Sequence, residues 1–426
     1  MIVQRGSHPI KANTDRHPGT WLLVSVLGLL GVMYCLAGLY CLMFDNKVSF
    51  PTDLRYRWLE QYTMYQGGNP QSREYHDNVI ENFHHSDVNA ISHESEYPPW
   101  SYFTGIFLIP PMRWEFSRYY FGVVNGIALA IMACWAHATG KGFGKANAAL
   151  CACAVLAMCP TALCVSYGQY TVFVMACLIG SLLLCERGRD NLTGVCLGMA
   201  LIKPHVAALF VLPMLVRGKT RVIVAMMVYV IGASCVTWLI TGTDPLTMLM
   251  AGFNASRHVL SPRSHNYLIL AARDAFGPKA ATLLMASLGG GLCLVLVFLL
   301  RKQKSLLASF SVCAIICMFW SYRKHYDCVL LGFPLVCLLV MARQTKLWPV
   351  MGLFLAFGAS VWYPIRYTQW HLPIVSVSQT VVWLLALVVI VVLARKGYGD
   401  LLTVSESKAT GEPNPPPDNR AEAVID

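Results

Sequence analysis

Long apolar runs separated by short polar and basic segments dominate this chain. A helix needs about 20 apolar residues to cross a bilayer, and ten runs come near or exceed that length. These predicted helices cover residues 21–44, 119–138, 147–165, 171–185, 222–241, 280–300, 306–321, 326–342, 347–363 and 374–394. The pattern predicts an all-α polytopic membrane protein.

The apolar segment 192–216 differs from the others because Lys203 and Pro204 interrupt it. Proline cannot continue a helix, and the polar segments on both sides of this run are basic. One straight span would place one basic flank outside the cell. Two short helices, 192–202 and 205–216, would form a hairpin that keeps both flanks inside and bring the expected bundle to about 11–12 passes.

The basic residues set the predicted orientation, since cytoplasmic loops carry an excess of lysine and arginine. With the hairpin counted as two passes, alternate loops hold Lys141, Lys145, Arg187, Arg189, Arg217, Lys219, Arg221, Arg301, Lys302, Lys304, Arg343, Lys346, Arg395 and Lys396. We therefore expect a cytoplasmic N-terminus (1–20), a membrane domain (21–395) and a disordered cytoplasmic tail (396–426).

This orientation places two long loops, 45–118 and 242–279, outside the cytoplasm. The first is rich in acids: Asp45, Asp53, Glu60, Glu74, Asp77, Glu81, Asp87, Glu94 and Glu96. Its apolar stretch 101–111 is too short to span, so it is expected at the interface, with headgroup-level anchors at Trp100, Tyr102 and Trp114. Long loops in a compact membrane protein are usually functional.

Composition agrees with this interpretation. Only 13% of the residues are charged, against roughly 25% in soluble domains. The net charge of +11 comes mainly from short loops between apolar runs, which indicates topology and not a nucleic-acid surface. Most of the 16 cysteines lie inside apolar runs, where cysteine acts as a small hydrophobe.

Asp53 lies just beyond the first predicted span, in the sequence Pro-Thr-Asp-Leu-Arg-Tyr-Arg-Trp. It would either cap a helix that begins here or act as a general base. Arg55 and Arg57 would keep Asp53 ionised or bind an anionic substrate. They share one face if the segment is extended and diverge if it is helical, and the sequence leaves both arrangements open.

Lys203 is the second candidate, because a lysine within an apolar segment costs roughly 2.5–3.5 kcal/mol and is usually functional. Snorkelling to lipid headgroups is the alternative, and the neighbouring His205 is placed to bind the same anion. At an outer loop, Arg323, Lys324 and His325 oppose the positive-inside bias and suggest an anion site.

Other motifs contribute less. Gln169, in a short polar turn, is a candidate ligand for a sugar hydroxyl, although turns need polar residues anyway. The histidines at 76, 84, 85 and 93 lack a two-histidine helical spacing, so no metal site is predicted. There is no Asp-x-Asp pair and no Walker phosphate loop, which leaves nucleotide chemistry without a visible site.

Several short motifs occur together in a characteristic order. An aspartate after the first helix is followed by Gly-Gly-Asn-Pro (67–70), Tyr-Pro-Pro (97–99), Gly-Gln (168–169), Gly198 with Lys203-Pro204, and His-Tyr (325–326). Over residues 20–395 the chain resembles glycosyltransferase family 87, polyprenol-phosphate-sugar enzymes with the GT-C architecture. It departs from that pattern at Thr171, where the family usually has asparagine.

The resemblance implies an inverting enzyme of the cytoplasmic membrane that transfers a sugar, most often mannose, outside the cytoplasm. The donor would be a polyprenyl-phosphate sugar and the acceptor a glycan or glycolipid, with no nucleic acid and no cofactor or metal. Asp53 would be the catalytic base, and Lys203, Arg323 and His325 would hold the donor phosphate. The sugar or acceptor pocket would include Arg55, Tyr97, Trp100, Gln169 and Asn266.

Two other classes remain open from the residues alone. A transporter or flippase would also use a broken helix and buried cations. A non-catalytic membrane scaffold would use the outer loops to bind a partner, but would leave the cost of Lys203 unexplained.

Overall fold

The computed structural model describes residues 18–44, 52–72, 75, 95, 97–259, 275, 277–320, 324–363 and 373–399, and its regular elements are all helical. The helices are α1 (Pro18–Phe44), α2 (Thr52–Tyr65), α4 (Pro99–Leu108), α5 (Trp114–Gly140), η3 (Lys141–Phe143), α6 (Lys145–Leu156), α7 (Cys159–Tyr167), α8 (Thr171–Glu186), α9 (Asp190–Ala200), α10 (Pro204–Ala207), η4 (Ala208–Val211), α11 (Leu212–Val216), α12 (Thr220–Thr241), α13 (Pro245–Val259), α15 (Pro278–Leu299), α16 (Leu307–Trp320), η5 (His325–Leu331), α17 (Gly332–Thr345), α18 (Trp348–Trp362) and α19 (Pro373–Arg395).

Five of the described helical segments are long and apolar enough to cross a membrane: Pro18–Phe44, Trp114–Phe143, Thr220–Thr241, His325–Thr345 and Val377–Arg395. A sixth is the pair α6 and α7, which is bent by 46°. The all-α polytopic class is thereby confirmed. Every predicted span corresponds to helix, but several of these helices are shorter than a full crossing, so the count of 11–12 passes stays a prediction.

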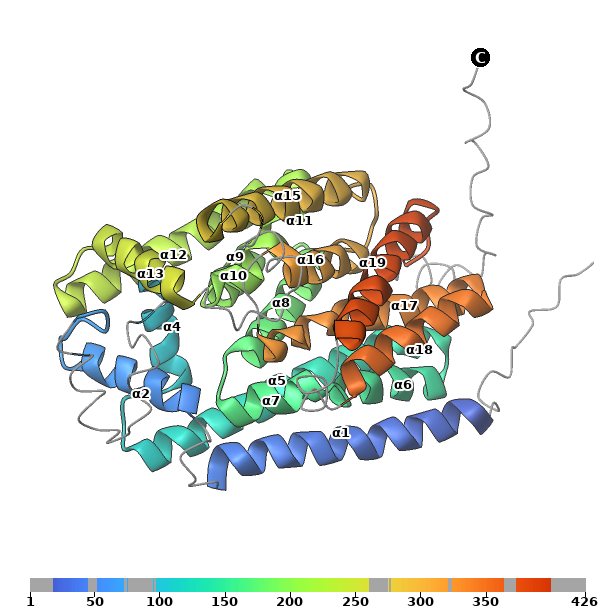
Figure 1. The fold of residues 1–426 in the computed structure, drawn as a ribbon, viewed down its shortest axis with the longest axis horizontal. Coiled ribbons are helices and arrows are strands. Elements are labelled where there is room, and N and C mark those ends of the chain that lie inside the picture. Colours follow the sequence, from blue (N-terminus) through green and yellow to red (C-terminus); the bar gives the residue numbers. More distant parts are fainter. Residues whose placement is uncertain are drawn as a thin grey trace, which may run out of the picture.

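The surface helices turn apolar side chains outward, as a bilayer requires. On α1, Leu22, Leu29 and Leu36 are more than 60% exposed, while Leu27 and Leu42 are buried against the bundle. In Figure 1, α1 runs along one edge of the molecule, whereas α2, α4, α12 and α13 gather at one end. Of the five described spans, the one formed by η5 and α17 is the most enclosed, since 94% of the residues in its most apolar stretch are buried.

The break at Lys203 occurs as predicted, since α9 ends at Ala200 and α10 begins at Pro204. The two flanks of the broken segment meet, because the Lys219 ammonium lies 3.2 Å from the Asp190 carboxylate. The chain therefore runs out to Lys203 and returns to the same end, which is the geometry that a hairpin predicts. The two charges stabilise this closure only weakly, since both side chains are partly exposed to solvent, 35% for Lys219 and 22% for Asp190.

Close packing against α12 determines the position of α9. An added Cβ at Gly198 would lie 2.6 Å from the Tyr229 ring, and one at Gly194 would overlap the Val222 carbonyl. Small residues four apart allow the backbones of α9 and α12 to approach closely, as in many membrane helix pairs. This packing places the end of α9, and therefore Lys203, beside α4.

The interfacial interpretation of residues 101–111 is wrong for Tyr102. This residue lies on α4, is 1% exposed and donates its hydroxyl to Ser95 Oγ at 2.7 Å. The side of α4 that carries Ser101, Tyr102 and Thr104 is buried, and the helix packs on α12. Short helices in a membrane protein can thus be buried within the bundle and need not lie on its surface.

Candidate active site

Asp53 is the second residue of α2, so the segment is helical and the two arginines diverge. Arg57 pairs with Glu60 and stacks 4.2 Å from the centre of the Tyr97 ring. Arg55 instead lies over Trp114, 5.3 Å from its ring centre. An acid in the first turn also interacts favourably with the helix dipole. Of the extended and helical arrangements that the sequence left open for Arg55 and Arg57, the structure therefore has the helical one.

A buried polar cluster anchors α2. Glu60 is 2% exposed, and the buried phenols Tyr75 and Tyr102 lie near it. Burial, followed by the negative charge of Glu60, raises the pKa of both phenols well above the usual value. Both therefore remain neutral donors, with Tyr75 bonding the Tyr56 carbonyl at 3.3 Å. This cluster holds the helix that carries Asp53.

The turn between α7 and α8 approaches Asp53 closely because it contains Gly168. This glycine ends α7 in the left-handed conformation, with φ 71°, where a side chain is strained. A Cβ there would also overlap the Cβ of Leu54, the neighbour of Asp53. The next residue, Gln169, donates its Nε2 hydrogen to Asp53 Oδ2. Gly168 thus permits the contact that Gln169 makes.

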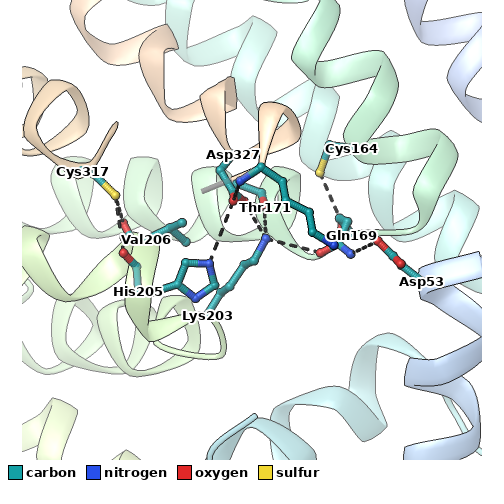
Figure 2. A network of polar contacts seen from close by, with 10 residues as sticks. Asp53, Cys164, Gln169, Thr171, Lys203, His205, Val206, Cys317 and Asp327 are labelled. Atoms are coloured by element: carbon teal, nitrogen blue, oxygen red, sulfur yellow. Dashed lines mark hydrogen bonds and ion pairs between the residues drawn. The ribbon is translucent and has the colours of Figure 1, made fainter. Parts of the chain in front are cut away.

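Lys203 lies on the other side of Gln169 and is only 3% exposed. Its Nζ donates to Asp327 Oδ1 at 2.5 Å, to Thr171 Oγ1 at 3.0 Å and to Gln169 Oε1 at 3.3 Å. Figure 2 shows these contacts as one continuous chain from Asp53 to Asp327. We call Asp53, Gln169, Thr171, Lys203 and Asp327 the polar network.

Asp327 has a role that sequence reasoning missed. It is 1% exposed, accepts the Thr171 hydroxyl at 2.8 Å and accepts the backbone N–H of Lys324 at 3.1 Å. His205 Nε2 lies 4.0 Å from Asp327 Oδ2. The available signal was an acid three residues after Lys324, the spacing of a capping box at the start of a helical turn.

The Tyr-Pro-Pro-Trp corner supports the break in α9. Because α9 ends at Ala200, the carbonyls at its C-terminal end have no N–H partner within the helix. The Trp100 indole donates to the Leu201 carbonyl at 2.8 Å, and the Ser101 hydroxyl donates to the Ile202 carbonyl at 2.9 Å. These two bonds from α4 hold the backbone that presents Lys203.

The predicted site residues are therefore only partly brought together. Asp53, Gln169 and Lys203 share the polar network, and His325 begins η5 two residues before Asp327. Tyr97 meets the Tyr170 ring edge-on at 5.7 Å. Arg55 and Trp100 make the contacts with Trp114 and Leu201 given above. Arg323, Asn266 and the four histidines at 76, 84, 85 and 93 lie outside the described residues.

This combination defines a polytopic, all-helical membrane protein with a carboxylate and a buried lysine–aspartate pair at the junction of α2, α8, α9 and η5. Residues 96–342, more than half of the chain, match the model of glycosyltransferase family 87. The chain belongs to this family and is a membrane glycosyltransferase. Asp53 precedes the matched region, whereas Gln169, Lys203 and Asp327 lie within it. No curated protein and no solved structure matches the chain.

Proposed function

We propose that this glycosyltransferase has the GT-C architecture and moves a hexose, with mannose as the first candidate, from a polyprenyl-phosphate carrier to a glycan or glycolipid acceptor. The reaction takes place on the outer face of the cytoplasmic membrane and inverts the sugar's anomeric configuration. The observation that carries this proposal is the position of Asp53. Its carboxylate is half-buried and accepts an amide N–H, and the residue lies in the first turn of α2, the next described helix after the membrane span α1.

The chemistry assigns one proton transfer to Asp53. As general base it removes the proton of the acceptor hydroxyl, whose oxygen attacks the anomeric carbon of the donor sugar. The bond from that carbon to the phosphate oxygen breaks, and its electron pair leaves with the polyprenyl phosphate. Because this phosphate is already a good leaving group, the proposed reaction needs neither a nucleotide nor a metal.

The carrier phosphate gains negative charge as it leaves, and fixed cations stabilise such charge. We assign this role first to the basic segment 323–325, where Arg323 and His325 were expected to act. Lys324 Nζ lies 5.9 Å from the centre of the Tyr326 ring, and Lys203 lies 4.5 Å from the same ring. Lys324, in the described part of the basic segment, thus lies near the same ring as Lys203 of the polar network.

Incubation of the purified protein with labelled polyprenyl-phosphate sugars and a membrane extract tests the proposal. A lengthened, labelled glycan or glycolipid is expected with at least one hexose donor. If a transport assay in vesicles shows that the labelled lipid changes leaflets while no sugar is transferred with any donor, the proposed reaction is wrong.

Replacing His325 with alanine is expected to weaken stabilisation of the leaving phosphate. We expect kcat/KM for the donor to fall by about 10²-fold, the loss typical when one group that stabilises developing charge is removed. The matched control is His137→Ala, which changes an exposed histidine in the last turn of α5. Equal donor kinetics for His325→Ala and the wild type would remove His325 from the phosphate site.

Replacing Gly168 with alanine tests the approach of the turn to α2. The left-handed conformation alone costs about 1–2 kcal/mol for an L side chain, and the overlap with Leu54 adds to it. Gly188→Ala is the control, since Gly188 has φ 69° but nothing within 4 Å of its added Cβ. We expect both variants to melt earlier, but only Gly168→Ala to lose transfer activity. Equal activity in the two variants would contradict this assignment.

A further inference from the structure

The donor capacity of Lys203 is fully used inside the protein. An ammonium has three N–H groups and no acceptor. Its three hydrogen-bond partners are Asp327, Thr171 and Gln169, each at 3.3 Å or less. The side chain is also almost completely buried. To bind the carrier phosphate directly, Lys203 would have to give up one of these partners.

The orientation of the Gln169 amide is determined from both ends. Lys203 can only donate, so it selects the amide oxygen Oε1; an ionised Asp53 can only accept, so it selects the nitrogen Nε2. If the amide were flipped, its oxygen would face the Asp53 carboxylate and its N–H groups would face the Lys203 ammonium. Both contacts would then be repulsive. The charge of Lys203 therefore enforces the hydrogen bond that Asp53 receives.

Asp327 in turn holds Lys203. Its Oδ1 accepts from the ammonium and from the Thr171 hydroxyl, and its Oδ2 accepts the backbone N–H of Lys324. In Figure 2 the side chains of Lys203 and Thr171 converge on Asp327. The buried ion pair is thus tied to α8 and η5, while Gln169 connects it to α2.

We infer that Lys203 and Asp327 are positioning residues that act on Asp53 through Gln169, and that Lys203 is not the phosphate ligand that its sequence context suggests. The bond to Gln169 engages Asp53 Oδ2 and leaves the carboxylate oriented to take the acceptor proton with Oδ1. This inference rests on the proposed role of Asp53 as general base, and it extends that role to a buried pair on two other elements.

A double-mutant cycle tests the inference. The pair-neutral variant Lys203→Met/Asp327→Asn avoids leaving one buried charge alone, and it is compared with Gln169→Met and with the triple variant. Residues that act through a shared partner give non-additive losses. We expect the pair-neutral variant and Gln169→Met each to lower kcat by roughly 10–100-fold, as a misplaced catalytic group does. The kcat of the triple variant should be no lower than the lower of these two values. The donor KM should be unchanged in all three variants.

A phosphate ligand behaves differently. If Lys203 binds the carrier directly, the pair-neutral variant will raise the donor KM, and its loss will multiply with that of Gln169→Met. Either result overturns the inference. Lys203→Arg keeps the charge and the donors, so its kcat should be higher than that of the pair-neutral variant if positioning is the role. Melting temperatures of all variants separate these effects from unfolding.

A readout without activity makes this test independent of the proposed function. In a cryo-EM structure of Lys203→Met/Asp327→Asn, we expect the Gln169 side chain to have left Asp53. If its amide still donates to Asp53, the inference fails even where the enzyme is active. If the wild type transfers no sugar, the proposed function fails, and the structure still decides whether the buried pair orients Gln169.

Discussion

Asp53→Asn should lower sugar transfer by about 10²–10⁴-fold, the range typical for loss of a general base. Asparagine has nearly the same shape as aspartate and can still accept a hydrogen bond from Gln169 through its side-chain oxygen. It cannot take the acceptor proton. We therefore expect α2 and the melting temperature to be retained while kcat falls. Initial rates with a labelled polyprenyl-phosphate hexose measure the loss.

The matched control is Asp244→Asn. Asp244 is also an acid at a helix N-terminus, where it accepts the backbone N–H groups of Leu246 and Thr247 at 3.1 and 2.9 Å. Asparagine caps helices about as well as aspartate, so this variant should remain active and stable. A fully active Asp53→Asn enzyme would show that Asp53 serves its helix and not the reaction.

Asp327→Asn is expected to cause the largest loss of stability, because it leaves the Lys203 charge buried without its counter-ion. Removing one partner of a buried ion pair typically costs about 3–5 kcal/mol. Replacing both charges together costs much less, since neither remains uncompensated. The pair-neutral variant Lys203→Met/Asp327→Asn should therefore be more stable than Asp327→Asn alone, as measured by thermal unfolding in detergent.

The partly exposed pair of Lys219 and Asp190 provides the comparison. Water already solvates both of these charges, so Asp190→Asn should cost less than about 1 kcal/mol. If Asp327→Asn were as mild as Asp190→Asn, Lys203 would not depend on Asp327 for its charge. If the pair-neutral variant were as unstable as Asp327→Asn, the loss would come from packing and not from an unpaired ammonium.

Local sequence patterns predicted much of the fold. A span is recognisable from its own residues because each backbone group bonds within its own helix and lipid demands an apolar exterior. The break at Lys203 was equally local, since Pro204 lacks an N–H. The orientation of Arg55 and Arg57 could not be predicted from local sequence, because the same residues were compatible with an extended and with a helical segment.

The candidate site was predicted only in part, for a related reason. Asp53, Gln169 and Lys203 were recognisable singly, as polar residues beside or within apolar runs. Trp100 was expected at the headgroup level and in a substrate pocket, yet its indole bonds a carbonyl 101 positions away in the chain. The sequence analysis assigned no role to Asp327, because its partner, Lys203, lies 124 positions away in the chain.

By itself, the sequence determined that this protein is a helical membrane protein, that its chain breaks at Lys203, and that Asp53 follows a span. Only the tertiary structure decided that Gln169 bridges Asp53 to Lys203 and that Asp327 neutralises the lysine. The reason is physical: hydropathy and proline act over a few residues, whereas a hydrogen bond between distant segments depends on how several helices pack together.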